Sequence, residues 1–351
     1  MKAREAFVIL TPGFPASESD DTCLPERQVF VRSLIKQYQD IDIIILTFHY
    51  PYTANQYKWY GAEVISFGGQ NHGKFKKLNI WFQVWQTLTR LNQQKRIIGV
   101  LSFWLGECAF VGNFFSRRYH RKHFCWLLGQ DAKKGNRYIQ LIKPHSESLI
   151  AISDFIAEEL HRNYKIRPAH IITSGIDTDL FTQQSFDREI DVLGAGSLTT
   201  LKQFDIFINI IHELNKFIPG LKAVLCGKGP LKQHLLQQIK DLHLESSITL
   251  LDEIPHKNVL QLMQKTKVFL HTSSYEGWST VCMEALYAGA HVIAFCRPMN
   301  ESMPHFHILS SKADMIKEIG AILQDQERAH TSIFPFPIQQ TVKKVMDLYA
   351  R

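Results

Sequence analysis

The sequence has few cysteines, and none of them are spaced as pairs. Its 351 residues include six, which are Cys23, Cys108, Cys125, Cys226, Cys282 and Cys296. Thiols scattered in this way exclude a disulfide scaffold and a Cys-x-x-Cys zinc site. They favour a protein that works in a reducing compartment.

Long apolar runs are also missing. The apolar run nearest the N-terminus is AFVIL, residues 6–10, which is too short for a signal peptide or a membrane span. We expect it to form the first strand of a cytoplasmic protein. The sequence shows no internal repeat or low-complexity segment.

An excess of charge is confined to one half of the chain. Residues 1–185 hold 23 Lys and Arg against 16 Asp and Glu, a net charge of +7, whereas residues 186–351 hold 17 of each. With 351 residues the chain exceeds what one core normally organises, so two domains are expected. A basic surface on the first domain indicates an anionic partner or membrane surface. No recognisable nucleic-acid-binding module accompanies the charge, and we expect no nucleic-acid partner.

The first half alternates short apolar runs with helical segments. Strands are expected at residues 6–10, 41–48, 63–67, 97–103, 124–128, 149–152 and 169–173. A helix is expected between the first two, over residues 26–39. This alternation predicts an α/β domain with a mostly parallel sheet that is covered on both faces.

The segment from Lys74 to Leu91 predicts an amphipathic helix. Its apolar residues recur at spacings of three and four, and they are Phe75, Leu78, Trp81, Phe82, Trp85, Leu88 and Leu91. Lys74, Lys76 and Lys77 flank this stripe. Two interpretations stay open: a helix docked on its own sheet, or a helix that lies on the anionic inner face of a membrane.

Several polar or small residues follow strands of the first half. They are Gly13 after the first strand, Trp104 and Glu107 after residues 97–103, and Gln130 and Asp131 after residues 124–128. The carboxyl ends of parallel strands meet at one edge of a sheet, so we expect these residues to face one crevice. A tryptophan face with polar neighbours suits a sugar ring, although a tryptophan buried on a sheet is the commoner arrangement. Gly13 would let the backbone approach a ligand, or it serves only a Pro-Gly turn.

The second half contains two glycine loops in succession. Strand DVLGAG is followed by a loop with Ser197 and Lys202, and strand AVLC by Gly227 and Gly229. Pro230 then suits the first turn of a helix. Lys202 stands at a helix start, where an ammonium group neutralises a diphosphate.

The stretch HTSSYEGWSTVCMEALYAGAHVIAF, residues 271–295, organises the rest of the prediction. A strand leads into a loop with Glu276, a helix opens near Ser279 and carries Glu284, and the helix stops at Gly289 before the next strand. A helix start at the carboxyl end of a strand offers N–H groups and a positive dipole end to a phosphate. Glutamates also occur at helix starts simply as caps, so either residue alone carries little weight.

The pattern SYEG…EAL…AGA, with Glu276 and Glu284 separated by seven residues, resembles the signature of retaining glycosyltransferases of family 4, which belong to the group 1 glycosyltransferases. The resemblance implies the GT-B fold, in which two Rossmann-like, doubly wound α/β domains face each other across a cleft. We place the acceptor-side domain at residues 1–181, the nucleotide-sugar domain at 182–334, and at 335–351 a terminal helix that packs back on the first domain.

The resemblance also implies roles for individual residues. Glu276 would orient the donor sugar, Glu284 would hold the ribose, and Lys202 would neutralise the diphosphate. The other expected donor-binding residues are Gly13, Ser197, Gly227, Gly229, Ile254, Gly277, Trp278, Ser279, Thr280 and Val281. The family usually has Arg, Gly and His where this chain has Ser197, Ser279 and Leu128, so Gln130 or Asp131 would supply the polar contact to the sugar.

The function implied is a retaining hexosyltransferase that needs no metal and no cofactor. It would move a sugar from a nucleotide sugar, with UDP or GDP favoured, to a glycan or lipid-linked acceptor in polysaccharide or glycoconjugate synthesis. The pair Asp177 and Asp179 resembles a metal-binding triplet, but it precedes a linker and is discounted. The alternatives are a nucleotide-sugar epimerase or a sugar phosphorylase of the same fold, a non-catalytic sugar-nucleotide-binding or polysaccharide-binding protein, and a basic nucleic-acid or membrane-surface adaptor.

Overall fold

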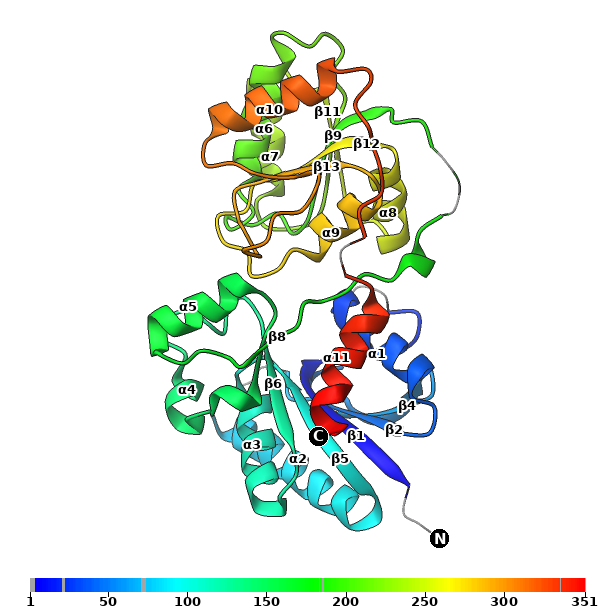
Figure 1. Ribbon diagram of the computed structural model, residues 1–351, viewed down its shortest axis with the longest axis vertical. Helices are drawn as coiled ribbons and strands as arrows, with labels where there is room; N and C mark the ends of the chain where they lie inside the picture. Colours follow the sequence, from blue (N-terminus) through cyan, green and yellow to red (C-terminus); the bar gives the residue numbers. More distant parts are fainter. Residues whose placement is uncertain are drawn as a thin grey trace. The chain divides into compact units, whose positions relative to one another are not determined.

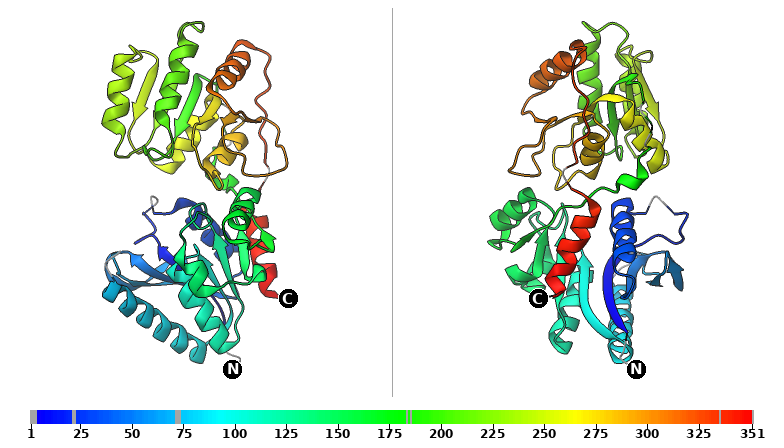
Figure 2. Two further views of the ribbon diagram at one scale, coloured as in Figure 1. Left: turned by 90° about the vertical axis from the view of Figure 1, so that its left-hand side faces the viewer. Right: turned by 45° about the vertical axis from the view of Figure 1, so that its right-hand side comes forward.

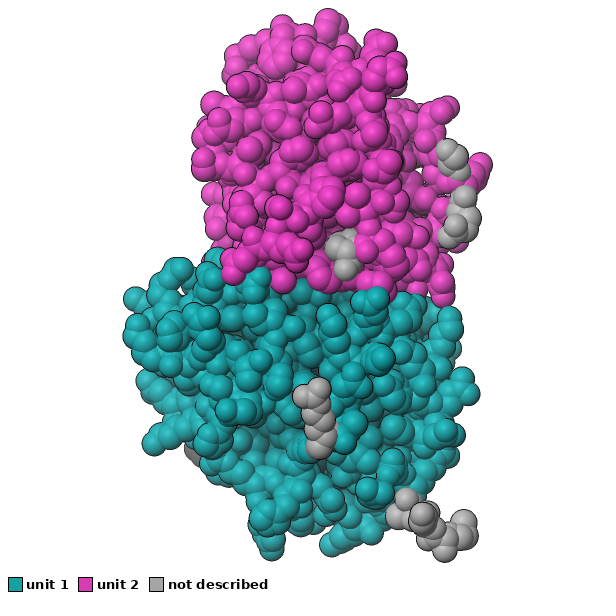
Figure 3. All heavy atoms as spheres, in the orientation of Figure 1, with its two compact units in different colours: residues 1–175, 338–351 teal, residues 176–337 magenta. Residues whose placement is uncertain are grey.

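The computed structural model describes residues 4–20, 23–70, 74–182, 184, 186–334 and 336–350. These residues form two compact units, which Figure 3 colours separately. Unit 1 comprises residues 1–175 and 338–351, and unit 2 comprises residues 176–337. A β-bridge between Ile176 and Pro337 joins the two ends of unit 2. The two units thus divide at residues 176 and 338, and the boundaries expected from the sequence are residues 182 and 335.

Unit 1 is built on a twisted sheet that is parallel except at one edge (Figure 1). Its strand order is β3-β4-β2-β1-β5-β6-β7-β8, and β3 runs antiparallel to β4. Within the described residues the strands are β1 (Glu5–Gly13), β2 (Asp42–Tyr50), β3 (Ala54–Trp59), β4 (Ala62–Phe67), β5 (Arg96–Phe103), β6 (His123–Leu127), β7 (Leu149–Ala151) and β8 (His170–Ile171). This sheet agrees with the parallel α/β domain that the sequence predicts.

Strand β3 is an element that the sequence prediction missed. It forms a hairpin with β4 through Tyr60 and Gly61, both of which have positive φ, at 45° and 95°. Positive φ at both central residues is typical of a type I′ turn. The strand is polar and mostly exposed, so it carries no apolar alternation by which it would be recognised.

Helices cover the two faces of the unit 1 sheet. They are α1 (Pro25–Gln37), α2 (Lys74–Gln94), α3 (Glu107–Tyr119), α4 (Arg137–Ile142), α5 (Asp154–Tyr164) and α11 (Ile338–Ala350). Part of the core lies between the sheet and helices α2 and α3, where Val8, Ile44, Val84, Val100 and Phe115 are buried together. Burial of this apolar surface is the main force that fixes α2 and α3 on the sheet.

The predicted apolar stripe of α2 coincides only in part with the buried face. Leu88 and Leu91 of the stripe are buried against the sheet, together with Ile80 and Val84. In contrast, Leu78 and Phe82 are 56% and 58% exposed. The helix therefore docks on its own sheet with one face and presents two large apolar side chains, one turn apart, on another.

The C-terminal helix α11 belongs to unit 1, where it packs beside α1 (Figures 1 and 2). Tyr349 lies over Gly99 of β5, where a Cβ atom would stand 2.0 Å from the tyrosine ring. The tyrosine hydroxyl donates to the Val100 carbonyl over 2.8 Å. A glycine at position 99 thus makes room for the ring that anchors the end of the chain.

Unit 2 contains a wholly parallel sheet in the order β11-β10-β9-β12-β13-β14. Its described strands are β9 (Ile190–Ala195), β10 (Ala223–Cys226), β11 (Ile248–Leu251), β12 (Thr266–His271), β13 (His291–Ala294) and β14 (Phe306–Ile308). Its helices are α6 (Phe204–Asn215), α7 (Lys232–Asp241), α8 (His256–Gln264), α9 (Thr280–Tyr287) and α10 (Lys312–Gln324). This is the strand order of a doubly wound dinucleotide-binding domain, with its switch point between β9 and β12.

Candidate donor site in unit 2

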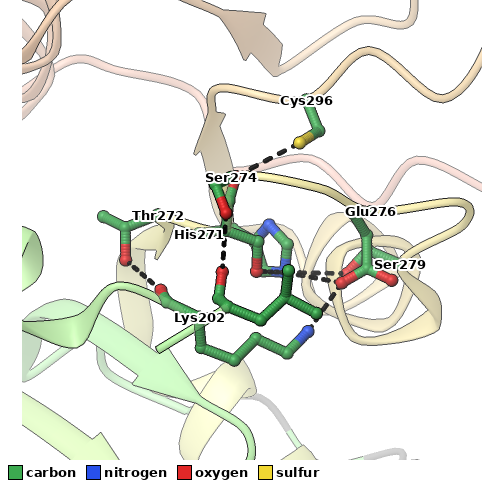
Figure 4. A network of polar contacts seen from close by, with 9 residues as sticks. Lys202, His271, Thr272, Ser274, Glu276, Ser279 and Cys296 are labelled. Carbon is green, nitrogen blue, oxygen red and sulfur yellow. Dashed lines mark hydrogen bonds and ion pairs between the residues drawn. The ribbon is translucent and has the colours of Figure 1, made fainter. Parts of the chain in front are cut away.

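The switch point of unit 2 brings together Lys202 and Glu276. Lys202 lies in the loop after β9, and Glu276 lies in the loop after β12. The ammonium Nζ of Lys202 is 2.6 Å from Oε2 of Glu276, and both side chains are about one fifth exposed (Figure 4). The two residues that the sequence predicts as catalytic thus lie where open α/β sheets bind ligands.

His271, the last residue of β12, completes this cluster. Its Nε2 lies 3.6 Å from Oε2 of Glu276, and 3.2 and 3.3 Å from the hydroxyls of Ser273 and Ser279. Burial lowers the pKa of His271, so the imidazole is neutral at pH 7. Burial by itself raises the pKa of Glu276, but the nearby His271 imidazole and the charge of Lys202 outweigh this effect, so the pKa lies below its usual range.

Hydrogen bonds tie the Lys202 loop to the Glu276 loop. The hydroxyl of Thr272 donates to the Lys202 carbonyl over 2.8 Å, and the Ser274 N–H donates to the Leu201 carbonyl over 3.1 Å. Behind Glu276 a cavity of about 10 Å³ lies against His271 and Cys296. That is room for about one water molecule. The Lys202–Glu276 pair is therefore held by packed, cross-linked loops.

The two glycine loops of unit 2 interlock beside this pair. Gly196 N–H donates to the Cys226 carbonyl over 3.0 Å, and Leu198 N–H donates to the Lys228 carbonyl over 3.0 Å. A Cβ atom on Gly227 would lie 1.9 Å from the Gly196 carbonyl oxygen, and one on Gly229 would lie 2.4 Å from that of Leu198. Both glycines are thus needed for the loops to pass each other closely. Ser197, the residue after Gly196 in the loop that follows β9, has an exposed side chain.

Helix α9 begins next to Glu276. Ser279 is its N-cap, yet its hydroxyl makes no capping bond to the helix and faces His271 instead. Trp278 is 5% exposed and packs edge-on against Phe336, with ring centroids 5.1 Å apart. Gly277 is buried, and Thr280 and Val281 are partly exposed in the first turn of the helix. The packing of Trp278 against Phe336 therefore fixes the start of the helix.

Glu284 lies one turn further along α9 and is 9% exposed. Its Oε1 is 2.8 Å from Nε2 of His256, the first residue of α8. Ile254, which the sequence predicts near the base, is partly exposed two residues before His256. The two carboxylates of the predicted pair thus each have a histidine beside them. The sequence prediction missed both histidines; a histidine that ends a buried strand was the available signal for His271.

In unit 1, the predicted sugar-side residues lie at carboxyl ends of the strands. Trp104 follows β5 with φ of 66°, which is left-handed backbone that a non-glycine residue rarely adopts. Its N–H donates to the Trp126 carbonyl over 3.1 Å. Gln130 is exposed after β6, and Gly13 ends β1 with the Tyr50 carbonyl 3.9 Å from where its Cβ would be.

Glu107 and Asp131, which the sequence predicts on the acceptor or sugar side, are engaged by protein groups in unit 1. Glu107 accepts from Trp81 Nε1 and faces His49 Nε2, both over 2.7 Å, and pairs with Lys77 over 3.2 Å. Asp131 is 6% exposed and accepts the Leu128 N–H over 2.8 Å. Burial raises the pKa of Asp131 to about 7. Glu107 therefore links the start of α3 to α2 and β2, and Asp131 holds the loop after β6 together. The contact of these carboxylates with a sugar or acceptor stays a prediction.

The described part of the chain contains no group of three or more His, Cys, Asp and Glu side chains arranged to hold a metal ion. Nor does it contain a helix with the length and apolar character that crossing a membrane requires.

The fold and this site define a class of protein. Residues 176–305, most of unit 2, match the sequence model of the family described as glycosyl transferases group 1. These residues therefore resemble a group 1 glycosyltransferase domain, and the match to group 1 that the sequence resemblance predicts is confirmed over them. The assignment to family 4 stays a prediction.

Particular relatives extend this result. One relative is the Campylobacter jejuni enzyme N-acetylgalactosamine-N,N'-diacetylbacillosaminyl-diphospho-undecaprenol 4-alpha-N-acetylgalactosaminyltransferase. The two sequences are 30% identical over 163 residues, an alignment that covers 44% of this chain and 43% of the enzyme. The chain is 24% identical to the uncharacterized glycosyltransferase MJ1178 of Methanocaldococcus jannaschii, over 75% of this chain and 73% of that one. Less than half of the Campylobacter enzyme is thus covered.

Solved structures confirm the predicted GT-B fold. The Anabaena protein Alr3699/HepE, solved in complex with UDP-glucose, has a TM-score of 0.73 over 99% of each chain at 16% identity. At this identity the likeness concerns the fold, and it extends over both units.

Proposed function

We propose that the protein is a retaining glycosyltransferase that moves a sugar from a nucleotide sugar to a hydroxyl acceptor. The observation that carries the proposal is the Lys202–Glu276 pair, 2.6 Å apart at the switch point of a group 1 domain. A lysine, an interlocked glycine turn and a helix start next to one carboxylate suit a diphosphate with a sugar attached.

The reaction follows from these groups. The bond between the anomeric carbon and the diphosphate oxygen breaks, and the charge that develops on the diphosphate is stabilised by Lys202 and by the N–H groups at the start of α9. The acceptor oxygen bonds to the anomeric carbon on the same face, and its proton passes to the departing phosphate oxygen. Glu276 orients the sugar, and Glu284 binds the ribose hydroxyls.

We infer a UDP-sugar donor and a lipid-linked acceptor. UDP-glucose is the ligand named for the Anabaena protein, and the name of the Campylobacter enzyme contains a diphospho-undecaprenol acceptor. Since Lys202 and the helix start supply positive charge, we propose that the reaction needs neither a divalent metal nor a cofactor. Turnover that persists in EDTA and gains less than about twofold from Mg²⁺ or Mn²⁺ supports this; an absolute metal requirement refutes it.

The test of the proposal is mass-detected transfer from a panel of UDP-, GDP- and ADP-sugars to lipid-linked and glycan acceptors. Glu276→Gln keeps the size of the side chain and removes its charge, so transfer falls by about 100-fold or more. The control is Glu213→Gln on α6, because Glu213 forms an exposed ion pair with Lys216. Donor binding without turnover in the wild type would identify a sugar-nucleotide-binding protein instead, and epimerised or phosphorolysed products would identify the enzyme alternatives.

Unit 1 supports a membrane-docking role that fits a lipid-linked acceptor. Leu78 and Phe82 are exposed one turn apart on α2, with the exposed Lys76 beside them. Lys77, in contrast, is engaged by Glu107. Apolar side chains with a basic rim bind anionic lipid surfaces.

The docking proposal is tested by flotation with vesicles that contain phosphatidylglycerol, at low and high salt. The double variant of Leu78→Ser and Phe82→Ser should lose binding and keep its fold, because both side chains are exposed. A buried residue of the same helix such as Val84 would be a poor control, because its substitution would disturb the fold. The control is therefore His234→Gln, on the exposed surface of α7. Unchanged binding of the double variant would refute a role for α2.

A further inference from the structure

If Lys202 binds the donor, Glu276 and the diphosphate of the donor compete for its ammonium group. In the structure its ammonium is paired with Glu276 over 2.6 Å. A diphosphate brings negative charge to the same ammonium. When Lys202 turns to the phosphate, Glu276 loses its strongest cationic partner while its side chain is only 20% exposed. A carboxylate left without a partner in such a place is costly.

His271 lies where it can replace Lys202 as the partner of the Glu276 carboxylate. Its Nε2 is 3.6 Å from the same Oε2 atom that Lys202 contacts. The side chain is 4% exposed and lies at the end of β12, so it stays in place when a long lysine side chain swings away. The hydroxyls of Ser273 and Ser279, at 3.2 and 3.3 Å, fix Nε2 toward the carboxylate. Figure 4 shows Lys202, His271 and Ser279 around Glu276.

We propose that His271 is a positioning residue for Glu276, and that it becomes the partner of this carboxylate when Lys202 is taken up by the diphosphate of the donor. The inference rests on the proposed function and concerns the same site.

The exchange predicts uptake of a proton. The charge of Lys202 lowers the pKa of His271 in addition to the larger effect of burial, while Glu276 raises it. Withdrawal of the ammonium therefore raises the pKa of His271 and favours the imidazolium form, which pairs with Glu276. The other titratable groups that line this place are the thiols of Cys282 and Cys296. Burial raises the pKa of the first to about 12 and of the second to about 11, so both stay neutral near pH 7.

The experiment is titration calorimetry of the wild-type protein with the nucleotide sugar that it binds best, without acceptor, in buffers of different ionisation enthalpy. A nucleotide sugar is a diphosphate diester and lacks the phosphomonoester group that titrates near pH 6. The protons taken up therefore enter the protein. We expect uptake of a fraction of one proton, and a Kd that falls as the pH is lowered from 8 to 6 by at most about tenfold per pH unit.

The variant is His271→Gln, which keeps an N–H donor and does not titrate. It should bind the donor without proton uptake, with kcat lowered by about 10- to 100-fold and KM changed less, as for residues that orient a functional ligand. The control is His234→Gln on α7, whose side chain is exposed. The fold of each variant is checked by thermal unfolding.

A second measurement avoids any substitution. The histidine Cε1–H resonances of the wild-type protein are followed with pH, with and without donor. One buried histidine should titrate at higher pH when donor is bound. Binding without proton uptake, or the same uptake in His271→Gln, overturns the inference and leaves the proposed function intact. If no nucleotide sugar binds, the proposed function fails and this inference fails with it.

Discussion

The contact between the two glycine loops of unit 2 gives a sharp prediction for Gly227→Ala. The added Cβ atom would stand 1.9 Å from the carbonyl oxygen of Gly196, which is backbone and has no rotamer to change. The loops must therefore separate by more than 1 Å. Overpacking of this kind costs about 1–3 kcal/mol, and the bond from Leu198 N–H to the Lys228 carbonyl, worth about 1 kcal/mol, is strained as well.

The natural control is Gly196→Ala on the facing loop. Gly196 has φ of 149°, similar to 157° at Gly227, but its Cβ would meet nothing closer than 3.6 Å. Both variants share the backbone strain of about 1 kcal/mol, and only Gly227→Ala adds the overlap. We expect unit 2 to lose about 2–4 kcal/mol more in Gly227→Ala than in Gly196→Ala.

The assay is chemical and thermal unfolding together with donor binding. For a unit of this size each kcal/mol lowers Tm by about 2–4 °C, so Gly227→Ala should melt about 4–16 °C below Gly196→Ala. The donor affinity should fall in parallel, because the loop that carries Lys202 is displaced. Equal Tm values for the two variants would refute the reasoning from the interlocked loops.

Two further predictions concern unit 1. Burial raises the pKa of Asp131 to about 7, above its unfolded value near 4. Between these pH values the native state binds more protons than the unfolded state, so the free energy of unfolding of unit 1 falls as the pH rises from about 4 to 7. Urea unfolding of Asp131→Asn should show a weaker pH dependence of this free energy, and an unchanged pH dependence would assign it to another group. Tyr349→Ala removes a ring that fills the space over Gly99 and should destabilise unit 1 by about 3–5 kcal/mol, whereas Tyr349→Phe loses only the bond to Val100 at about 1 kcal/mol; a similar loss in both variants would contradict the packing role.

Much of unit 2 was predictable because its signals are local in the sequence. Apolar runs mark the buried strands, glycines mark the tight loops, and the Glu276–Glu284 spacing marks the helix start. The topological rule that ligands bind at the carboxyl ends of strands then placed Lys202 and Glu276 in one crevice. That rule needs only the alternation of strands and helices.

The missed features depend on contacts between distant segments. The pairing of Lys202 with Glu276 requires β9 and β12 to be neighbours, which strand order decides and periodicity does not. His271 looked like part of a strand, since a single histidine gives no pattern. The sequence also gives no sign of the three side chains from elsewhere in unit 1 that contact Glu107.

Surface and core were also hard to separate on α2. Leu78 and Phe82 belong to the same apolar spacing as the buried residues, and only the width of the face that docks on the sheet left them outside. Strand β3 shows the opposite case, since it is polar and pairs only at the edge of the sheet.

The central claim is that Lys202 neutralises the diphosphate of a nucleotide-sugar donor, and the most direct measurement is kcat/KM for sugar transfer by Lys202→Met beside Lys216→Met. Lys216 forms an exposed pair with Glu213 at the far end of α6, so its substitution should leave transfer unchanged. Lys202→Met should lower kcat/KM by about 100- to 1,000-fold with the fold intact. Transfer by Lys202→Met within about threefold of the wild type would contradict the claim, because one lysine contributes little to binding the diphosphate in that case.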